Sequence, residues 1–130
     1  MPARCFLWSK LHGAVITEAN RDYQGSLAID PELMALADIR PNERIDVYNL
    51  DNGERLTTYA IPGKSGEICL NGAAALKGKP GQKIIVAAYA WLDEDEAKAH
   101  VPRVVLLNEQ NIPANAAKPA ADATEEQAGN

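Results

Sequence analysis

Cysteine is scarce in this sequence of 130 residues, which contains only Cys5 and Cys69. Two cysteines with no second pair and no nearby histidine do not form the ligand pattern of a structural zinc site or the repeated spacing of a disulfide framework. We therefore expect two free thiols in a reducing compartment and no metal ion.

Concentrated basic charge is missing as well. The 13 lysine and arginine residues are scattered along the chain and are outnumbered by 18 acidic residues, which gives a formal net charge of -5. Because a nucleic-acid-binding face needs clustered positive charge, the composition argues against a nucleic-acid partner.

Long apolar runs are absent too. The longest apolar stretch, residues 84–92, is far shorter than the roughly 18 apolar residues that a membrane-spanning helix needs. Residues 1–11 include Arg4 and Lys10 but no apolar core followed by a small-residue cleavage site, so no export signal is expected. We expect a soluble, cytoplasmic protein without a membrane partner.

The residues that are present suit one small, mainly β domain. Hydrophobic residues make up 46% of the chain, which is enough for a single core. Short apolar or alternating segments between turns predict six or more strands, and Asp51-Asn52-Gly53 predicts a hairpin. Asp30 and Pro31 are typical of the start of a helix, expected here to extend to about residue 37. The pattern favours a small β-barrel with short helices.

The last part of the chain has a different composition. From residue 111 onward Ala, Pro, Asn, Glu and Gly predominate, and no large apolar residue follows Ile112. Such a segment buries too little apolar surface to offset the entropy of ordering it. We expect one domain over residues 1–110 and a disordered tail over residues 111–130.

Polar residues that could carry chemistry fall on predicted strands. Lys10 and His12 are two positions apart and share one strand face, while Arg55, Thr57 and Tyr59 share a face of another strand. Taken singly, such residues are most often solvated or satisfied strand residues. They form a polar site if the two faces meet across a pocket.

The stretch Tyr23-Gln24-Gly25-Ser26 combines a flexible glycine with a hydroxyl group. By itself a Gly-Ser pair is most often a turn. The stretch does not match the G-x-S-x-G pattern of a nucleophile elbow, so a serine-triad hydrolase is not indicated. A catalytic Ser26 therefore needs a different role.

Five motifs taken together resemble the successive signatures of the L-aspartate 1-decarboxylase family, in the family's order and close to its spacing over residues 1–110. They are Lys10-Leu11-His12, Tyr23-Gln24-Gly25-Ser26 followed by Ile29-Asp30, Asp51-Asn52-Gly53 with Arg55, Thr58-Tyr59-Ala60-Ile61, and Asn71-Gly72-Ala73-Ala74-Ala75. The resemblance implies a six-stranded double-psi β-barrel and a homotetramer with active sites between neighbouring subunits. It also implies an enzyme that converts L-aspartate to β-alanine and carbon dioxide for pantothenate synthesis.

The resemblance further implies how the cofactor arises. The family's proenzyme cleaves itself between a glycine and a serine, here Gly25 and Ser26, and the serine becomes a pyruvoyl group. Thr58 and Asn71 would help to form or stabilise the intermediate of this processing. The pyruvoyl ketone takes the role of pyridoxal phosphate, because it condenses with the substrate amine and accepts the electron pair left by the lost carboxylate.

For turnover, the resemblance makes Tyr59 the proton donor that acts beside the group formed from Ser26. Arg55 would clamp a carboxylate, because its planar fork can hold both oxygens at once. The other substrate-binding residues would be Lys10, His12, Thr58 and the backbone of Gly72, Ala73 and Ala74, whose small side chains allow close approach.

Two positions depart from the family pattern. Gly13 stands where many relatives have a basic residue, and Leu76 stands where many have a histidine. Losing a cation beside the pocket supports a second hypothesis, in which the substrate is another acidic amino acid. The same loss could change the dependence of self-cleavage on a maturation factor. A third hypothesis, from another class, is an uncleaved β-barrel that acts as a binding or assembly module.

Overall fold

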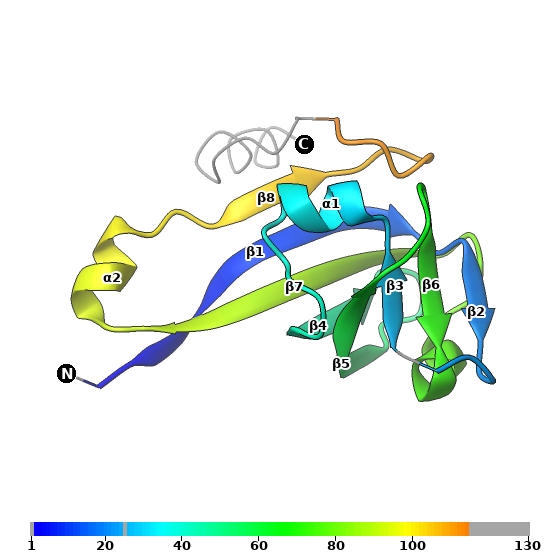
Figure 1. Cartoon of the computed structure of the whole chain (residues 1–130), viewed down its shortest axis with the longest axis horizontal. Helices are drawn as coiled ribbons and strands as arrows, with labels where there is room; N and C mark the ends of the chain where they lie inside the picture. The colour runs from blue at the N-terminus through cyan, green and yellow to red at the C-terminus, as the bar shows by residue number, and fades with distance from the viewer. Residues whose placement is uncertain (1, 25, 115–130) are drawn as a thin grey trace.

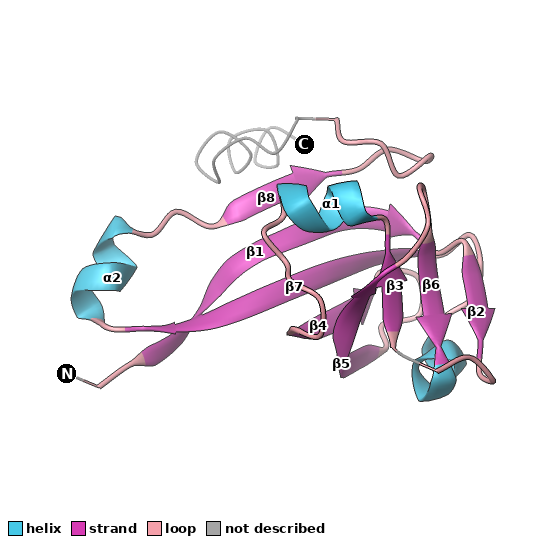
Figure 2. Ribbon diagram, in the orientation of Figure 1, coloured by secondary structure: helices cyan, strands magenta, loops and turns pink. Residues whose placement is uncertain are grey.

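Within residues 2–24 and 26–114, which the computed structural model describes, eight strands form one sheet (Figure 1, Figure 2). The strand order is β2-β6-β3-β5-β4-β7-β1-β8. In chain order the elements are β1 (Arg4–Val15), β2 (Glu18–Asn20), β3 (Leu27–Ile29), α1 (Pro31–Leu36), β4 (Arg44–Asn49), β5 (Arg55–Pro62), β6 (Ile68–Asn71), the 3-10 helix η1 (Gly72–Lys77), β7 (Lys83–Leu92), α2 (Glu94–Ala99) and β8 (Arg103–Leu106).

The sheet curls round on itself, because strands that are consecutive in the chain lie near opposite ends of the strand order. β2 follows β1 after only Ile16 and Thr17, yet β2 pairs with β6 at one end while β1 pairs with β8 at the other. The amide of Thr17 donates to the carbonyl of Ile68 (2.8 Å), and the amide of Ile68 donates to Thr17 Oγ1 (3.0 Å). The expected mainly β fold, with a barrel-like sheet and short helices, is confirmed. The short end strands β2 and β8 bring the sheet from the expected six strands to eight.

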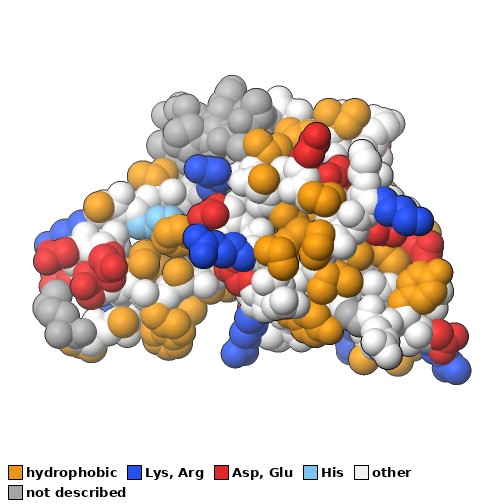
Figure 3. Space-filling view, viewed as in Figure 1, with side chains coloured by type: hydrophobic (Ala, Val, Ile, Leu, Met, Phe, Trp, Pro, Cys, Tyr) orange, Lys and Arg blue, Asp and Glu red, His pale blue; other side chains and the backbone are white. Residues whose placement is uncertain are grey.

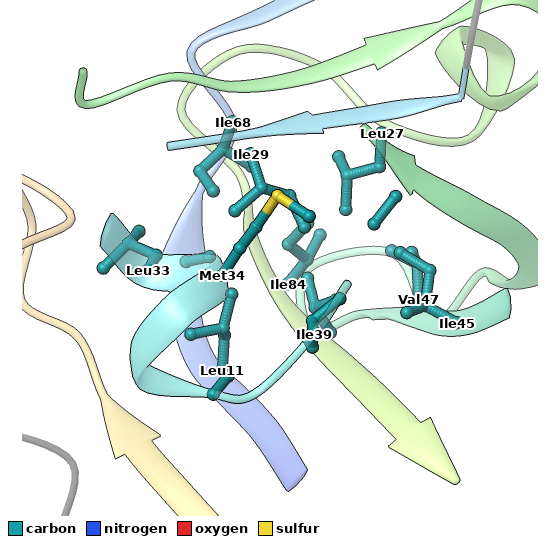
Figure 4. Close-up of a cluster of buried hydrophobic side chains, with 14 of the residues drawn as sticks. Leu11, Leu27, Ile29, Leu33, Met34, Ile39, Ile45, Val47, Ile68 and Ile84 are labelled. Atoms are coloured by element: carbon teal, nitrogen blue, oxygen red, sulfur yellow. The ribbon is translucent and has the colours of Figure 1, made fainter. Parts of the chain in front are cut away.

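Alternating burial along the strands places one apolar face inside the barrel. In β4, Ile45 and Val47 are buried, whereas Asp46 between them faces the other way. α1 covers this core with Leu33 and Met34 (Figure 4). Full burial of one such side chain contributes about 1.5–3 kcal/mol. Further large, fully buried side chains are those of Leu11, Ile16, Leu27, Ile29, Ile68, Leu70, Ile84, Val86 and Val105.

α1 begins where the sequence predicts. Asp30 Oδ1 accepts a hydrogen bond from the amide of Glu32 (2.8 Å), and Pro31 occupies the first turn of the helix. Oδ2 of the same carboxylate accepts from the amide of Gly66 (2.8 Å), in the loop before β6. One buried carboxylate therefore joins the helix start to a loop 36 positions away.

β1 and β7 extend beyond the barrel as a long antiparallel ribbon that leads to α2 (Figure 1). Asp93 and Glu96 form a capping box at the start of α2, and acidic side chains gather over this end of the molecule (Figure 3). Trp8 stacks on His100, with 4.6 Å between the ring centroids, which ties the chain after α2 back to β1. No helix in the described part of the chain is long and apolar enough to cross a membrane.

The segment after β8 packs back onto the barrel. Asn111 is buried, its Oδ1 accepts from the amide of Val15 (2.6 Å) and its Nδ2 donates to the Val15 carbonyl (2.9 Å). Leu107 also forms a β-bridge with Pro113. The first residues of the expected disordered tail, 111–114, are therefore held in place, because the Asn111 side chain pairs with the end of β1 as a strand backbone would. Residues 115–130 lie outside the described residues.

Candidate active site

Ser26 lies immediately before β3, which pairs with β5 on one side and β6 on the other. The amide of Tyr59 in β5 donates to Ser26 Oγ (3.3 Å), and the amide of Asn71 in β6 donates to the Ser26 carbonyl oxygen (2.7 Å). Ser26 is only 5% exposed, so both of its oxygens are held by neighbouring strands away from bulk water. Gly25, on the other side of the predicted scissile bond, lies outside the described residues.

Asn71 marks the point where β6 ends and η1 begins. Its side chain is buried, and its Oδ1 accepts from Cys69 Sγ (3.0 Å). The next residue, Gly72, has φ of 61°, a left-handed value that favours glycine. The chain therefore leaves the direction of β6 directly after Asn71, whose amide donates to the Ser26 carbonyl, and continues through Ala73 and Ala74 in η1.

β5 presents its predicted site residues on two faces. Tyr59 pairs with Arg44, and its side chain is 41% exposed on the outer face. Thr58 pairs with Ile45 and is half-buried on the inner side. The Tyr59 amide that donates to Ser26 Oγ belongs to the peptide bond between Thr58 and Tyr59. Thr58 is therefore next to this hydrogen bond.

The predicted basic residues lie in register on the outer face of the sheet. Arg55 on β5 pairs with Tyr48 on β4. Tyr48 in turn pairs with Ile85 on β7, and Ile85 pairs with His12 on β1. Side chains in register across strands point to the same face, so these four form one row. Lys10, two residues from His12, lies in the adjacent row of that face.

Burial changes the electrostatics of the basic pair on β1. Desolvation lowers the pKa of His12, and the charge of Lys10 lowers it further. Desolvation also lowers the pKa of Lys10. Nδ1 of His12 is buried and has no hydrogen-bond partner among the described residues. Desolvation and the charge of Lys10 both favour the uncharged imidazole of His12.

An aromatic platform holds Arg55. Its guanidinium carbon lies 4.0 Å from the centroid of the Tyr48 ring. The Tyr48 hydroxyl donates to Asp46 Oδ2 (3.1 Å) and, having one proton, accepts from the Tyr89 hydroxyl (2.8 Å). Asp46 Oδ1 accepts from Thr57 Oγ1 (2.8 Å). Burial, followed by the hydrogen bonds with Tyr89 and Asp46, raises the pKa of Tyr48, so its hydroxyl stays protonated.

The motifs that carry the family resemblance do not single out Asp46, Tyr48 or Tyr89. The positions of Tyr48 and Asp46 could be inferred from the sequence. The Asp51-Asn52-Gly53 hairpin places Tyr48 opposite Arg55, and strand alternation places Asp46 on the same face as Tyr48. The position of Tyr89 could not be inferred in this way, because β7 reaches β4 only through long-range pairing.

The predicted residues fall into two sets. We call them the serine group, which consists of Ser26, Thr58, Tyr59, Asn71 and the backbone of Gly72–Ala74, and the basic group, which consists of Lys10, His12 and Arg55. Within the basic group, β4 and β7 lie between Arg55 on β5 and the pair Lys10 and His12 on β1. β5 contributes to both groups. A surface hollow of about 440 Å³ is lined by Asp46 and Tyr89, which hold the Tyr48 hydroxyl, together with Trp91, and its lining includes no residue of either group.

Fold and site together define a class of protein. It is a small, mainly β barrel in which neighbouring strands hold both oxygens of a buried serine at the start of an inner strand. The family model of aspartate decarboxylase matches residues 2–114. The chain belongs to this family.

Curated relatives agree over most of the chain. It is 50% identical over 114 residues to the aspartate 1-decarboxylase of Thermoanaerobacter pseudethanolicus, covering 86% of this chain and 97% of that protein. It is 53% identical over 110 residues to that of Bacillus pumilus, covering 83% and 87%. It is 55% identical over 112 residues to that of Syntrophobacter fumaroxidans, covering 85% and 90%.

Proposed function

We propose that this chain is an enzyme that removes the α-carboxyl group of L-aspartate and releases β-alanine and carbon dioxide, after cleaving its own Gly25–Ser26 bond. The β-alanine serves pantothenate synthesis in the cytoplasm. The observation that carries the proposal is the buried Ser26, whose hydroxyl and carbonyl oxygens both accept hydrogen bonds from neighbouring strands. The name shared by the three relatives supports the same reaction.

Self-cleavage uses the Ser26 hydroxyl as the nucleophile. Oγ bonds to the Gly25 carbonyl carbon, the C–N bond between the two residues breaks, and the hydroxyl proton passes to the freed amine. Elimination of the Gly25 carboxylate across the Cα–Cβ bond of Ser26, followed by addition of water and loss of ammonia, leaves a pyruvoyl group at the start of residues 26–130. Thr58 and Asn71 stabilise the negative charge that develops on the Gly25 carbonyl oxygen.

Ser26 fits as the precursor of a pyruvoyl group. At 5% exposure it is shielded from competing water, and the Tyr59 amide orients its Oγ. Once formed, the group supplies a ketone that captures the substrate amine and accepts the electron pair released with carbon dioxide.

The remaining residues bind the substrate and move a proton. Arg55 holds a carboxylate with both arms of its guanidinium, which the Tyr48 ring supports from beneath. Lys10 adds a second positive charge, and neutral His12 lines the pocket. The Tyr59 hydroxyl delivers a proton to the carbon that has lost carbon dioxide. The backbone of Gly72, Ala73 and Ala74, together with Thr58, completes the substrate site.

We assign the two groups to one site formed between neighbouring copies in a homotetramer. The basic group lies on the outer face of the sheet, and the Tyr59 side chain is 41% exposed on that face. A second copy docked there would bring its own serine group against Arg55 and Lys10 and would exclude water from both.

Denaturing intact-mass spectrometry tests the proposal. The 14.0 kDa chain is expected to convert into two fragments, residues 1–25 and residues 26–130, the second starting with pyruvoyl instead of serine. Ser26→Ala should stay whole, whereas Ser65→Ala, at an exposed serine, should cleave like the parent. A parent chain that stays whole after prolonged incubation would overturn self-processing. Cleavage of the purified chain alone would show that no maturation factor is required.

One observation favours a second candidate substrate. Leu76, where the family resemblance implies a histidine in many relatives, is 76% exposed on η1, just beyond the small-residue backbone of the serine group. A different acidic amino acid would then meet an apolar rim. Carbon dioxide release from aspartate, glutamate and cysteate should be compared on the cleaved chain, and release from aspartate alone would exclude this candidate. If the parent and Ser26→Ala both stay whole and neither releases carbon dioxide, the binding or assembly module becomes the favoured function.

A further inference from the structure

Cys69 is a buried thiol next to the serine group. It lies two residues before Asn71 on the same face of β6, and its Sγ is 3.0 Å from Asn71 Oδ1. Cys69 is 1% exposed, and its backbone pairs with Glu18 of β2 on one side and Ala28 of β3 on the other. The position of the thiol is therefore set by three strands at once.

The two ends of the Asn71 amide differ in chemistry. Oδ1 only accepts hydrogen bonds, and Nδ2 only donates them. Because the Cys69 thiol donates to Oδ1, Nδ2 points away from Cys69. The hydrogen bond from the Asn71 amide to the Ser26 carbonyl already fixes the Asn71 backbone. The bond from the thiol therefore affects only the orientation of the Asn71 side-chain amide.

We propose that Cys69 is a positioning residue for self-cleavage, because its thiol donates to Asn71 Oδ1 and keeps Nδ2 available to donate to the oxyanion that develops at the scissile bond. This role rests on the self-cleavage proposed above. It gives the buried thiol a function that acts only through Asn71.

The state of the thiol agrees with a donor role. Burial, followed by the nearby carboxylates of Glu18 and Glu67, raises the pKa of Cys69 to about 11. The thiol is therefore protonated at neutral pH and differs from a reactive thiolate. If Cys69 were only a small core residue, an apolar side chain of the same size would serve equally well.

Two substitutions separate these roles. Cys69→Ser keeps a hydrogen-bond donor at the same place, whereas Cys69→Val removes the donor and keeps an apolar side chain that is larger by one heavy atom. Uncleaved chain made by cell-free translation gives a defined starting time, and denaturing mass spectrometry then follows the fragments. Cys69→Val should cleave about three- to tenfold more slowly than the parent, the loss expected for one hydrogen bond, and Cys69→Ser should stay within about twofold of it.

A double-mutant cycle shows whether Cys69 acts through Asn71. In the Asn71→Ala background no amide remains to be positioned, so Cys69→Val and Cys69→Ser should cleave at the same rate. Equal slowing by Cys69→Val with and without the Asn71 amide would overturn the proposal, as would a Cys69→Val rate equal to the parent's. If circular dichroism shows that Cys69→Val does not fold, Cys69→Ala takes its place against Cys69→Ser, and equal rates for that pair would also overturn it. A parent chain that never cleaves would instead refute the proposed function itself.

Discussion

Arg55 depends on its neighbours for its place in the site. It begins β5 on the outer face of the sheet, and the Tyr48 ring at 4.0 Å restrains its guanidinium group from one side. Asp46 and Tyr89 in turn hold the Tyr48 hydroxyl. An arginine restrained in this way loses less side-chain entropy when it binds a carboxylate, so the platform should improve substrate binding.

Replacing Tyr48 tests this effect. Tyr48→Leu removes the ring and should raise the KM for aspartate roughly 2- to 30-fold, the range expected for a lost cation–π contact. kcat should change little, because the contact forms equally in the bound substrate and in the transition state. Steady-state kinetics on fully cleaved protein provide the measurement. Tyr48→Phe, which keeps the ring and loses the two hydroxyl bonds, should have the smaller effect, and a fall in kcat at constant KM would contradict the platform role.

Among the elements, α1 shows how a short helix is stabilised. Its six residues, Pro31–Leu36, are too few to form a stable helix alone. The helix persists because Leu33 and Met34 enter the core and because Asp30 binds both the helix start and the loop at Gly66. α2 is capped in a similar way by Asp93 but buries no residue.

The two caps make a matched pair for a stability measurement. Asp30→Ala should lower the free energy of unfolding by about 2–3 kcal/mol, because it removes the cap and a second, buried, charged hydrogen bond. Asp93→Ala should lower it by about 0.5–1 kcal/mol, because its cap is exposed. Urea unfolding in the uncleaved Ser26→Ala background gives both values. Equal losses in the two variants would show that the bond to Gly66 contributes nothing.

At the scale of the whole molecule, the proposed homotetramer predicts that the basic group of one copy works with the serine group of another. Ser26→Ala lacks the nucleophile and should be inactive, and Arg55→Gln lacks the clamp and should be nearly so. When both variants are produced in the same cell, mixed assemblies contain sites with an intact serine group from one copy and an intact basic group from another. We expect such assemblies to recover part of the parent's carbon dioxide release. Mixed assemblies as inactive as the two separate variants would place each site within one copy.

Local features of the fold were predictable from the sequence. Asp30 and Pro31 begin α1 as expected, and Asp51-Asn52-Gly53 connects β4 to β5, with Gly53 at φ of 75°. The aromatic support of Arg55 was only partly predictable. Strand alternation puts Tyr48 and Asp46 on one face, but the hydroxyl of Tyr89 reaches Tyr48 from a strand 41 positions away.

The sequence by itself determined the strand-rich character, the helix start, the hairpin and the ordered set of motifs that marks the family, because each depends on residues close together in the chain. Only the tertiary structure decided that Ser26 is held between β5 and β6, and that the Cys69 thiol donates to the side chain of Asn71 beside it. The same holds for the clamp of Asn111 on Val15. These contacts join segments from different parts of the sheet, so they follow from the packing of the whole barrel and not from any local preference.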